Sequence, residues 1–225
     1  MSDRPVALIT GASRGIGAAV ARSLAPTHDL LLGGRDRELL EDLADEFPSA
    51  SAWPVDLTSV SSDDVAAISS LDVLVHSAGV AFLGPLAEAS VDVWRQTFEI
   101  NLIAVASLTR LLLPALRAAG GHVVLINSGA GLQANPNWGV YAASKFALRA
   151  FGDSLRAEEQ AIRVTSVHPG RVDTDMQRDV RSQEGGEYQP QYYLEADSVA
   201  SAVRTAVLAG ADAHFTEIIV RPRAH

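Results

Sequence analysis

The sequence contains no cysteine, only two methionines, and few aromatic residues (6%). Without cysteine, the chain can form neither a disulfide nor a thiolate metal site, which fits a cytoplasmic protein. Positive charge is also scarce, because 18 lysine and arginine residues stand against 27 aspartate and glutamate residues, a net charge of −9. Phosphate backbones repel such a chain, so we expect no binding to nucleic acids or anionic membranes.

Long uninterrupted hydrophobic runs are absent as well. The most apolar stretch, Leu102 to Leu116, is broken by Arg110 and Pro114, and we expect a core helix that is too short to span a membrane. An apolar strand pattern begins at Pro5, with no basic leader before it, so we expect no signal peptide. No cluster of metal-ligating residues is apparent, and the sequence predicts no metal site.

The sequence does contain short apolar runs that alternate with longer helical patterns, which is typical of βαβ units and a parallel sheet. With 225 residues, 48% of them hydrophobic, the chain can bury one large core, and we predict a single α/β domain over residues 1–225. The predicted strands are Val6–Thr10, Asp29–Gly33, Ala50–Val55, Asp72–His76, His122–Asn127, Arg163–Val167 and Phe215–Val220. The predicted helices are Gly15–Ala25, Arg37–Glu46, Val60–Ser69, Ser90–Ala118, Gly139–Gln160, Asp173–Arg181 and Asp197–Ala209.

Residues 178–193 lack a clear period and contain two adjacent glycines and three tyrosines. In most proteins such a segment is an ordinary surface loop. In an α/β fold, however, a long loop beyond the carboxyl ends of the strands can cover the ligand site. We therefore interpret this segment as a surface loop or a substrate lid.

A glycine-rich turn, Thr10-Gly-Ala-Ser-Arg-Gly-Ile-Gly17, joins the first strand to the first helix. Glycine permits a tight turn and a close approach to a pyrophosphate, and the helix N-terminus offers free N–H groups with partial positive charge. In this strand–turn–helix context, the pattern favours a nucleotide-binding site over a merely flexible turn.

Tyr141 and Lys145 are four residues apart in a predicted helix, and Ser128 lies thirteen residues before the tyrosine. Residues at this spacing share a helix face, so an ammonium would stand beside a phenol. A neighbouring cation favours phenolate and would bring the tyrosine pKa nearer to neutral, as a general acid or base requires. Taken alone, such a pair is more often structural.

Together these motifs resemble the short-chain dehydrogenase/reductase superfamily. The turn has its Thr-Gly-x-x-x-Gly-x-Gly pattern, and Ser128 with Tyr141 and Lys145 match its Ser and Tyr-x-x-x-Lys. Further matches follow in chain order: Asp56, Ala78-Gly79, Asn101 and Pro169-Gly170. The resemblance spans essentially the whole chain. It implies a doubly wound Rossmann sheet of seven parallel strands in the order 3-2-1-4-5-6-7, helices on both faces, a nicotinamide cofactor, and a carbonyl or alcohol substrate.

The resemblance implies catalytic roles for four residues. Tyr141 would exchange a proton with the substrate oxygen, and Ser128 would polarise that oxygen. Lys145 would lower the tyrosine pKa and bind the nicotinamide ribose. Asn101 is similar to the family's helix-kinking asparagine, whose backbone holds a water that links the lysine to solvent. Its alternative is an ordinary buried polar residue.

The same resemblance implies a cofactor-binding set drawn from the ends of several strands. Thr174 has an alternative role, since it could simply cap a short helix. The set comprises Gly11, Ser13, Arg14, Gly15, Ile16, Gly17, Arg35, Asp56, Leu57, Ser77, Ala78, Gly79, Tyr141, Lys145, Pro169, Gly170, Val172 and Thr174.

The charges near the second strand favour NADP(H). NAD-dependent proteins of this type place an acid at the end of that strand to bind the ribose hydroxyls. Here a glycine takes that place and Arg35 follows soon after, with Arg14 in the glycine turn. Two guanidinium groups suit a 2′-phosphate. NAD(H) stays open, because a strand ending one residue later would bring Asp36 near the ribose, and Arg35 could also be a solvated turn residue.

One departure from the family pattern is His76-Ser77, where most relatives have Asn-Asn. We expect the change to remove an amide that in relatives ties the sheet to the first turn. His76 itself is expected to be a hydrogen-bonded residue at the core edge.

The sequence thus predicts an NADP-dependent oxidoreductase, a carbonyl reductase acting on a small ketone, aldehyde or secondary alcohol. The alternative is a non-catalytic NAD(P)-binding sensor or scaffold, which would be expected to lose the tyrosine or the lysine. The candidate pocket residues Phe82, Gln133, Trp138 and Tyr188 are mostly apolar or aromatic, which favours an uncharged substrate, although they could equally pack the core. The resemblance also implies a homodimer or homotetramer paired through helices 90–118 and 139–160.

Overall fold

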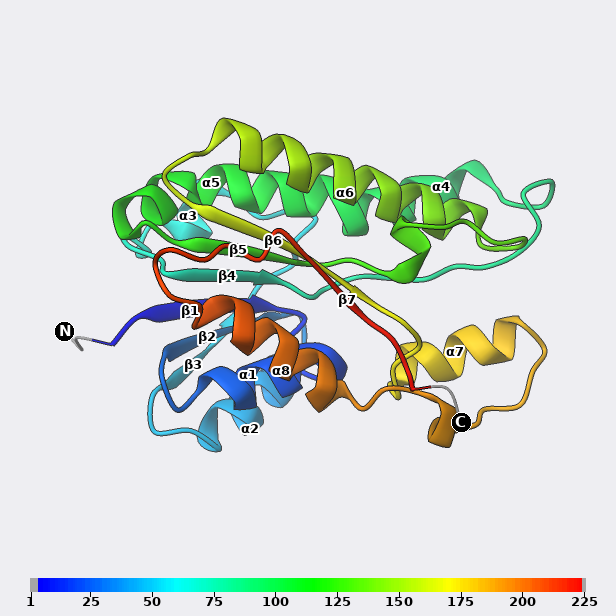
Figure 1. The fold of residues 1–225 in the computed structure, drawn as a ribbon, viewed down its shortest axis with the longest axis horizontal. Helices are drawn as coiled ribbons and strands as arrows, with labels where there is room; N and C mark the ends of the chain where they lie inside the picture. Colours follow the sequence, from blue (N-terminus) through cyan, green and yellow to red (C-terminus); the bar gives the residue numbers. More distant parts are fainter. Residues whose placement is uncertain (1–3, 224–225) are drawn as a thin grey trace.

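The computed structural model describes residues 4–223. Seven parallel strands form one sheet in the order β3-β2-β1-β4-β5-β6-β7, which confirms the doubly wound topology (Figure 1). The strands are β1 Val6–Thr10, β2 Asp29–Gly34, β3 Ala50–Pro54, β4 Val73–His76, β5 His122–Ile126, β6 Arg163–Pro169 and β7 Glu217–Val220.

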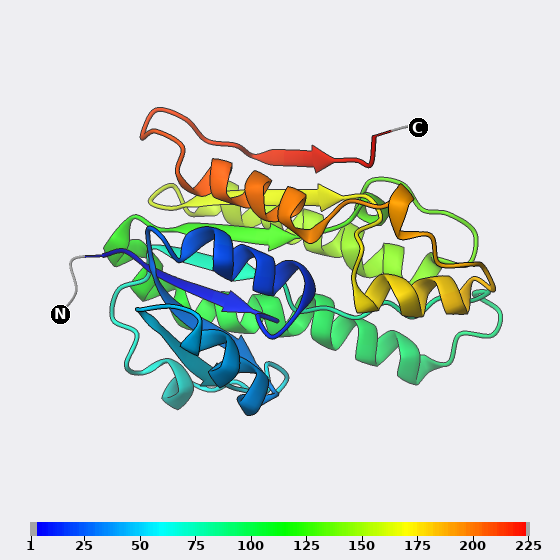
Figure 2. The same ribbon diagram turned by 90° about the horizontal axis from the view of Figure 1, so that it is seen from below.

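Helices cover both faces of the sheet. In Figures 1 and 2, α1, α2 and α8 lie on one side and α3 to α6 on the other, while α7 stands apart beyond the carboxyl ends of the strands. The helices are α1 Gly15–Leu24, α2 Arg37–Asp45, α3 Ser62–Val65, α4 Val91–Phe98, α5 Ala104–Ala119, α6 Gly139–Glu158, α7 Asp175–Gln183 and α8 Ala196–Val207. A π-helical turn (η1, Glu99–Ile103) and the short 3₁₀ turns η2 (Gly129–Gly131) and η3 (Pro190–Tyr192) complete the set.

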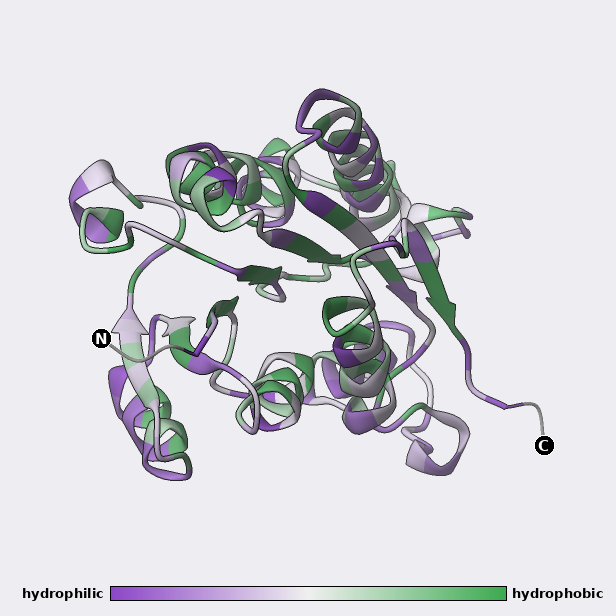
Figure 3. Cartoon of the chain, turned by 60° about the vertical axis from the view of Figure 1, so that its left-hand side comes forward, coloured by the Kyte–Doolittle hydropathy of each residue, from purple (hydrophilic) through white to green (hydrophobic). Residues whose placement is uncertain are grey.

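The apolar strands form two core layers because successive side chains point to opposite faces. In β1, Ala7 and Ile9 pack in the layer with α1, α2 and α8, while Leu8 packs in the layer with α5 and α6. All three side chains are fully buried. Figure 3 shows the resulting band of hydrophobic strands between helices whose outer sides are hydrophilic. Burial on both faces explains why the strands read as continuous apolar runs.

Several predicted boundaries are wrong. The helix predicted over Val60–Ser69 is a single turn at Ser62–Val65, because within α3 only Val65 is buried and so little apolar surface supports a longer helix. The last strand begins at Glu217 instead of Phe215. α7 begins two residues later than predicted, since Thr174 caps it, and it extends to Gln183. The helix therefore takes the first six residues of the segment 178–193.

The long helix predicted over Ser90–Ala118 is a helical run of 29 residues, Val91–Ala119. A π-helical turn lies within this run, between α4 and α5. By length and composition alone this run could cross a membrane. The stretch Leu102 to Leu116 thus belongs to a longer helix, which begins well before Leu102. Leu108, Leu112 and Leu116 are fully buried against the sheet, however, so core packing accounts for its apolar residues.

Candidate active site

The glycine turn places the N-terminus of α1 at the carboxyl edge of the sheet. Gly11 has φ +64°, a conformation that favours glycine, and a Cβ at Gly17 would lie 2.1 Å from the Gly11 carbonyl oxygen. Arg14 is the N-cap residue of α1, but its side chain makes no capping hydrogen bond. The first N–H groups of α1 are thus left for a ligand, and the compact turn fits a pyrophosphate.

The loop after β4 is tied to this turn by a threonine. The Thr10 hydroxyl accepts hydrogen bonds from the backbone N–H groups of Ser77 (3.1 Å) and Ala78 (3.3 Å). His76-Ser77 lacks the amide that relatives have there, and the Thr10 hydroxyl links the loop after β4 to the end of β1. The His76 ring is buried 2.9 Å from the Thr109 hydroxyl, and burial lowers its pKa to about 3. His76 is thus a neutral core residue, as expected.

Asn101 lies in the π turn and joins three parts of the site. Its side-chain oxygen accepts from the Val80 N–H (2.9 Å), and its amide donates to the Val80 carbonyl (2.9 Å) and the Ser144 hydroxyl (3.0 Å). The side chain is 1% exposed. The predicted distortion of the helix is confirmed, and Asn101 fixes the loop after β4 against α6. Its proposed water relay stays a prediction.

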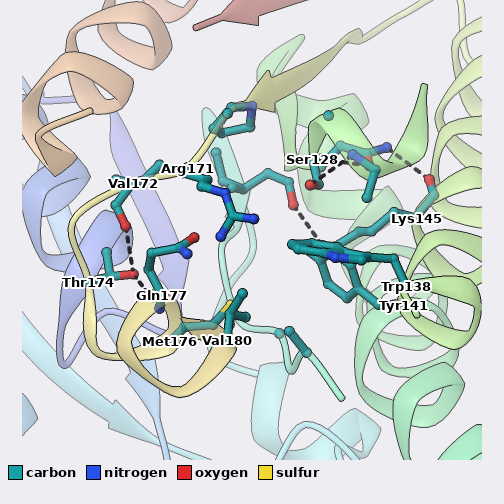
Figure 4. Close-up of a pocket in the computed structure, with 18 of the residues that line it drawn as sticks. Ser128, Trp138, Tyr141, Lys145, Arg171, Val172, Thr174, Met176, Gln177 and Val180 are labelled. Atoms are coloured by element: carbon teal, nitrogen blue, oxygen red, sulfur yellow. Dashed lines mark hydrogen bonds between the residues drawn. The ribbon is translucent and has the colours of Figure 1, made fainter. Parts of the chain in front are cut away.

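α6 places Tyr141 and Lys145 one helical turn apart, both nearly inaccessible at 7% and 5% exposure. The Lys145 ammonium lies 5.8 Å from the centre of the Tyr141 ring and donates to the Ile126 carbonyl at 3.0 Å. Ser128, the N-cap of η2, faces the same space from the end of β5 (Figure 4). The structure thus brings the three predicted side chains together.

Burial controls the pKa of both Tyr141 and Lys145. It raises the pKa of Tyr141 above its ordinary value, and a hydrogen bond with Ser128 acts in the opposite direction. It also lowers the pKa of Lys145 to about 8. The expectation that Lys145 brings the tyrosine pKa down is not met in the chain by itself, because removal from water has the largest effect on the Tyr141 pKa and raises it.

Asn127 is a residue of the site that the sequence analysis missed. Its side-chain amide donates to the Lys145 carbonyl (3.1 Å), and its side-chain oxygen accepts from the Ser128 N–H (2.8 Å). It is 3% exposed and holds Ser128 in place relative to α6. The sequence does indicate this residue, since Asn127 is a polar residue at the end of an otherwise apolar strand. The predicted strand His122–Asn127 included it without a role in the site.

One cavity of about 650 Å³ connects these groups with the cofactor motifs. Thr174 caps α7 by accepting from the Gln177 N–H at 3.3 Å, and a Cβ at Gly15 would lie 3.3 Å from its methyl group. The capping alternative thus holds, and the threonine also adjoins the glycine turn. The predicted site residues that line the cavity are Ile16, Ser77, Gly79, Ser128, Tyr141, Lys145, Pro169, Gly170, Val172 and Thr174.

The remaining predicted cofactor residues do not line this cavity. Gly11, Gly17 and Ala78 shape the turn, Ser13 is half-buried there, and Leu57 packs against the core. Arg14 is exposed, with its guanidinium 3.9 Å from the Asp175 carboxylate, a weak pair at the surface.

Arg35 is exposed just beyond the end of β2 and lines a shallow concavity with the three residues that follow it. β2 ends at Gly34, one residue later than predicted, but the Asp36 carboxylate accepts from the Leu39 N–H at 3.3 Å as the cap of α2. Two hydrogen bonds from Thr58 lower the pKa of Asp56, and the charge of Arg35 contributes.

The substrate side of the cavity is more polar than expected. Gln133 and Trp138 line it as predicted, but Phe82 and Tyr188 are not among its lining residues. The Tyr188 hydroxyl donates to Asp173, and the Arg178 guanidinium lies 4.2 Å from its ring, so this tyrosine is held outside. The charged residues Arg171, Glu184 and Arg221 line the cavity beside apolar ones such as Leu132 and Met176, so its lining is mixed. Over residues 4–223, no group of three or more acidic or histidine side chains could hold a metal ion.

Comparison with known proteins places these motifs in a family. Residues 5–185 match the family model described as short chain dehydrogenase. The chain is 35% identical to a glycine betaine reductase of Emericella nidulans over 97% of its own length and 34% identical to dehydrogenase/reductase SDR family member 7B of Bos taurus over 81%. It spans 19% and 62% of the lengths of those two relatives. It is also 36% identical to a short-chain type dehydrogenase/reductase of Sinorhizobium fredii, and the match covers 92% of the chain and 87% of that relative.

Solved structures agree with this result. An alcohol dehydrogenase from Thermococcus sibiricus, complexed with 5-hydroxy-NADP, is 28% identical in sequence to this chain and superposes with a TM-score of 0.87. The match covers 99% of this chain and the whole of the archaeal chain. A metagenomic short-chain oxidoreductase in complex with NADP is 31% identical with a TM-score of 0.80, over 98% of both chains. With its glycine turn, its Rossmann sheet and its Ser, Tyr and Lys around one cavity, this chain belongs to the short-chain dehydrogenase/reductase family of oxidoreductases.

Proposed function

We propose that this protein is an NADP-dependent carbonyl reductase that converts a small ketone or aldehyde to the alcohol, or runs the reverse reaction. The observation that carries the proposal is the buried cluster of Ser128, Tyr141 and Lys145, which shares one cavity with Ile16 of the glycine turn. Acid–base groups that lie beside a dinucleotide site are the arrangement that carbonyl reduction needs.

The residues of the glycine turn and of the loops after β4 and β6 would hold the cofactor. Uncapped N–H groups at the start of α1 would bind the pyrophosphate, and Arg35 with Arg14 would bind the 2′-phosphate of NADP. When bound, the nicotinamide supplies or accepts the hydride. The NADP complexes of the similar solved structures support this cofactor.

The proton is moved by this chain's own residues. Tyr141 would donate its phenolic proton to the carbonyl oxygen as that oxygen gains negative charge, and the Ser128 hydroxyl would stabilise the charge with a second hydrogen bond. Lys145 would re-protonate the tyrosine site, because with a pKa of about 8 it can exchange a proton near neutral pH. Asn101 would hold the loop after β4 against the π turn beside this site.

A single substitution tests the reaction. Tyr141→Phe should reduce turnover by at least about a thousandfold while NADPH still binds, because the proton donor is lost but the aromatic ring and the glycine turn are kept. Turnover is measured as NADPH oxidation with a panel of ketones and aldehydes, and binding is measured by calorimetry. Tyr192→Phe, at a tyrosine that is 54% exposed, is the matched control. Unchanged turnover in Tyr141→Phe would exclude the proposal.

The alternative is a sensor or scaffold that binds the nucleotide without chemistry. The intact cluster of Ser128, Tyr141 and Lys145 in one cavity argues against it.

We also propose that the protein works in the cytoplasm as a homodimer or homotetramer. Residues 178–193 would act as a substrate lid, since the Gln183 side chain bonds to the backbone of Leu83 and of Ala81, and Ala81 lines the cavity.

A further inference from the structure

Arg171 presents a charged group to the cavity from the loop after β6. The guanidinium forms a bidentate pair with Glu184, at 2.9 Å through Nη1 and 2.8 Å through Nη2, and lies 5.5 Å from the Trp138 ring. Its side chain is 36% exposed and lines the cavity. Figure 4 shows it between α7 on one side and Trp138 with Tyr141 on the other.

Glu184 does not neutralise this region. Its carboxylate also accepts from Arg181 at 2.5 Å and from the Trp138 indole N–H at 3.2 Å, so its oxygens are fully engaged. Two guanidinium groups against one carboxylate leave one positive charge. Within residues 4–223, Glu184 takes two of the five N–H groups of Arg171, which leaves three free for a ligand.

Arg221 adds a second cation at the other side of the cavity. It follows β7, and a Cβ at Gly129 would lie 3.2 Å from its Nη2, so the guanidinium stands beside the Ser128 turn. Its Nη1 donates to the His168 carbonyl at 2.7 Å. The cavity is thus lined by Lys145, Arg171 and Arg221 against one acid, Glu184. The lining favours an anionic ligand in a chain whose net charge is −9.

We propose that the substrate carries a carboxylate and that Arg171 binds it, so that the enzyme interconverts oxo acids and hydroxy acids. This inference rests on the proposed oxidoreductase function and names its substrate class. Arg171 is suited to the role because a guanidinium recognises a carboxylate by paired hydrogen bonds. The Trp138 ring lies 5.5 Å from Arg171 and 5.8 Å from the Tyr141 ring, so one aromatic side chain adjoins both the proposed carboxylate site and the proton donor.

The test compares each oxo acid with its methyl ester, which has nearly the same shape but no charge. The wild-type enzyme should prefer the acid in kcat/KM by at least about tenfold, the value of one hydrogen-bonded charge pair. Arg171→Gln should remove that preference, mainly by raising KM for the acid. The kcat/KM for the ester should change less than about threefold. Arg171→Lys should restore part of it.

Arg181→Gln is the matched control, because Arg181 also pairs with Glu184 but does not line the cavity. It should leave the preference for the acid in place. An equal kcat/KM for acid and ester in the wild type would overturn the inference, and so would equal effects of Arg171→Gln and Arg181→Gln on the preference for the acid. Turnover of neutral ketones in the same assays would still uphold the proposed function. In a second readout, calorimetry with the hydroxy acid and NADP⁺ should show binding to Tyr141→Phe and none to Tyr141→Phe/Arg171→Gln. Absence of binding to Tyr141→Phe also refutes the inference.

Discussion

At the scale of single residues, the site depends on a lysine that is removed from water. Lys145 is 5% exposed, and the one hydrogen bond that its ammonium makes within residues 4–223 goes to the Ile126 carbonyl. Burial without an acidic partner disfavours the charged form and lowers the pKa to about 8. The position therefore reduces the stability of the fold while it prepares a group for proton exchange.

This cost should appear as a pH dependence of stability. Below pH 8 the lysine is protonated in both the native and the unfolded chain, and burying its charge costs about 3 kcal/mol. Between pH 8 and 10.5 the native chain loses the proton that the unfolded chain keeps, so the free energy of unfolding rises with pH.

Lys145→Met should therefore be more stable than the wild type at pH 7, by up to about 3 kcal/mol, with the difference shrinking toward pH 9.5. Urea unfolding of both proteins between pH 7 and 9.5 measures this difference in the free energy of unfolding. Titratable groups that both proteins share contribute equally to the two free energies and cancel in the difference. A difference that stays constant over this range would contradict the shifted pKa.

Arg35 carries the prediction on cofactor choice. It is exposed just beyond the carboxyl end of β2, where one oxygen of the neighbouring Asp36 carboxylate caps α2. Arg35→Ala should raise KM for NADPH by about tenfold and leave KM for NADH nearly unchanged, since only NADPH has the 2′-phosphate. Steady-state kinetics with both cofactors decides this, with Arg37→Ala as the neighbouring control. An equal rise for both cofactors would rule out phosphate recognition by Arg35.

At the scale of elements, the π turn is the feature that links the helices to the active site. η1 interrupts the helix between α4 and α5 and places Asn101 where it satisfies both backbone groups of Val80. π turns inside α-helices are frequent at functional sites. Here it connects the loop after β4 to Ser144 of α6.

Asn101→Ala should destabilise the protein by about 3 kcal/mol, because it leaves the buried backbone groups of Val80 without partners. The proposed reductase activity should fall as well, since the loop carries Ser77 and Gly79 of the cavity. Gln96→Ala, at an exposed position of α4, should change stability by less than about 0.5 kcal/mol. Urea unfolding and NADPH oxidation are measured on both variants, and equal stability would show that Asn101 is dispensable for the fold.

At the scale of the whole molecule, two exposed apolar side chains lie on helices of the same face of the sheet. Ile103 of η1 is 51% exposed and Phe146 of α6 is 41% exposed. Their helices lie on the upper side of the sheet in Figure 1. Contiguous exposed apolar patches mark interaction sites, and these two side chains lie on the two helices of the predicted pairing face, so they are the positions that test it.

We expect the wild type to sediment as a dimer or tetramer in analytical ultracentrifugation. Ile103→Glu/Phe146→Glu should sediment as a smaller species, because charge is unfavourable at an apolar interface. Leu39→Glu, at an exposed leucine on α2 on the opposite face, should not change the assembly. A monomeric wild type would contradict the predicted assembly.

The sequence by itself determined most of the alternating strands and helices and most of the site, because glycine turns and Tyr-x-x-x-Lys have local physical requirements that a motif records. The strand order was implied only by the family resemblance that these motifs carry. The tertiary structure alone decided how the site is charged. Thr10 replaces a missing amide, Asn127 fixes Ser128, and Arg171 meets Glu184 only because β6 and α7 bring them together. The pKa direction of Tyr141 was likewise a matter of burial. Burial and long-range pairing depend on which segments pack together, and no local pattern contains that information.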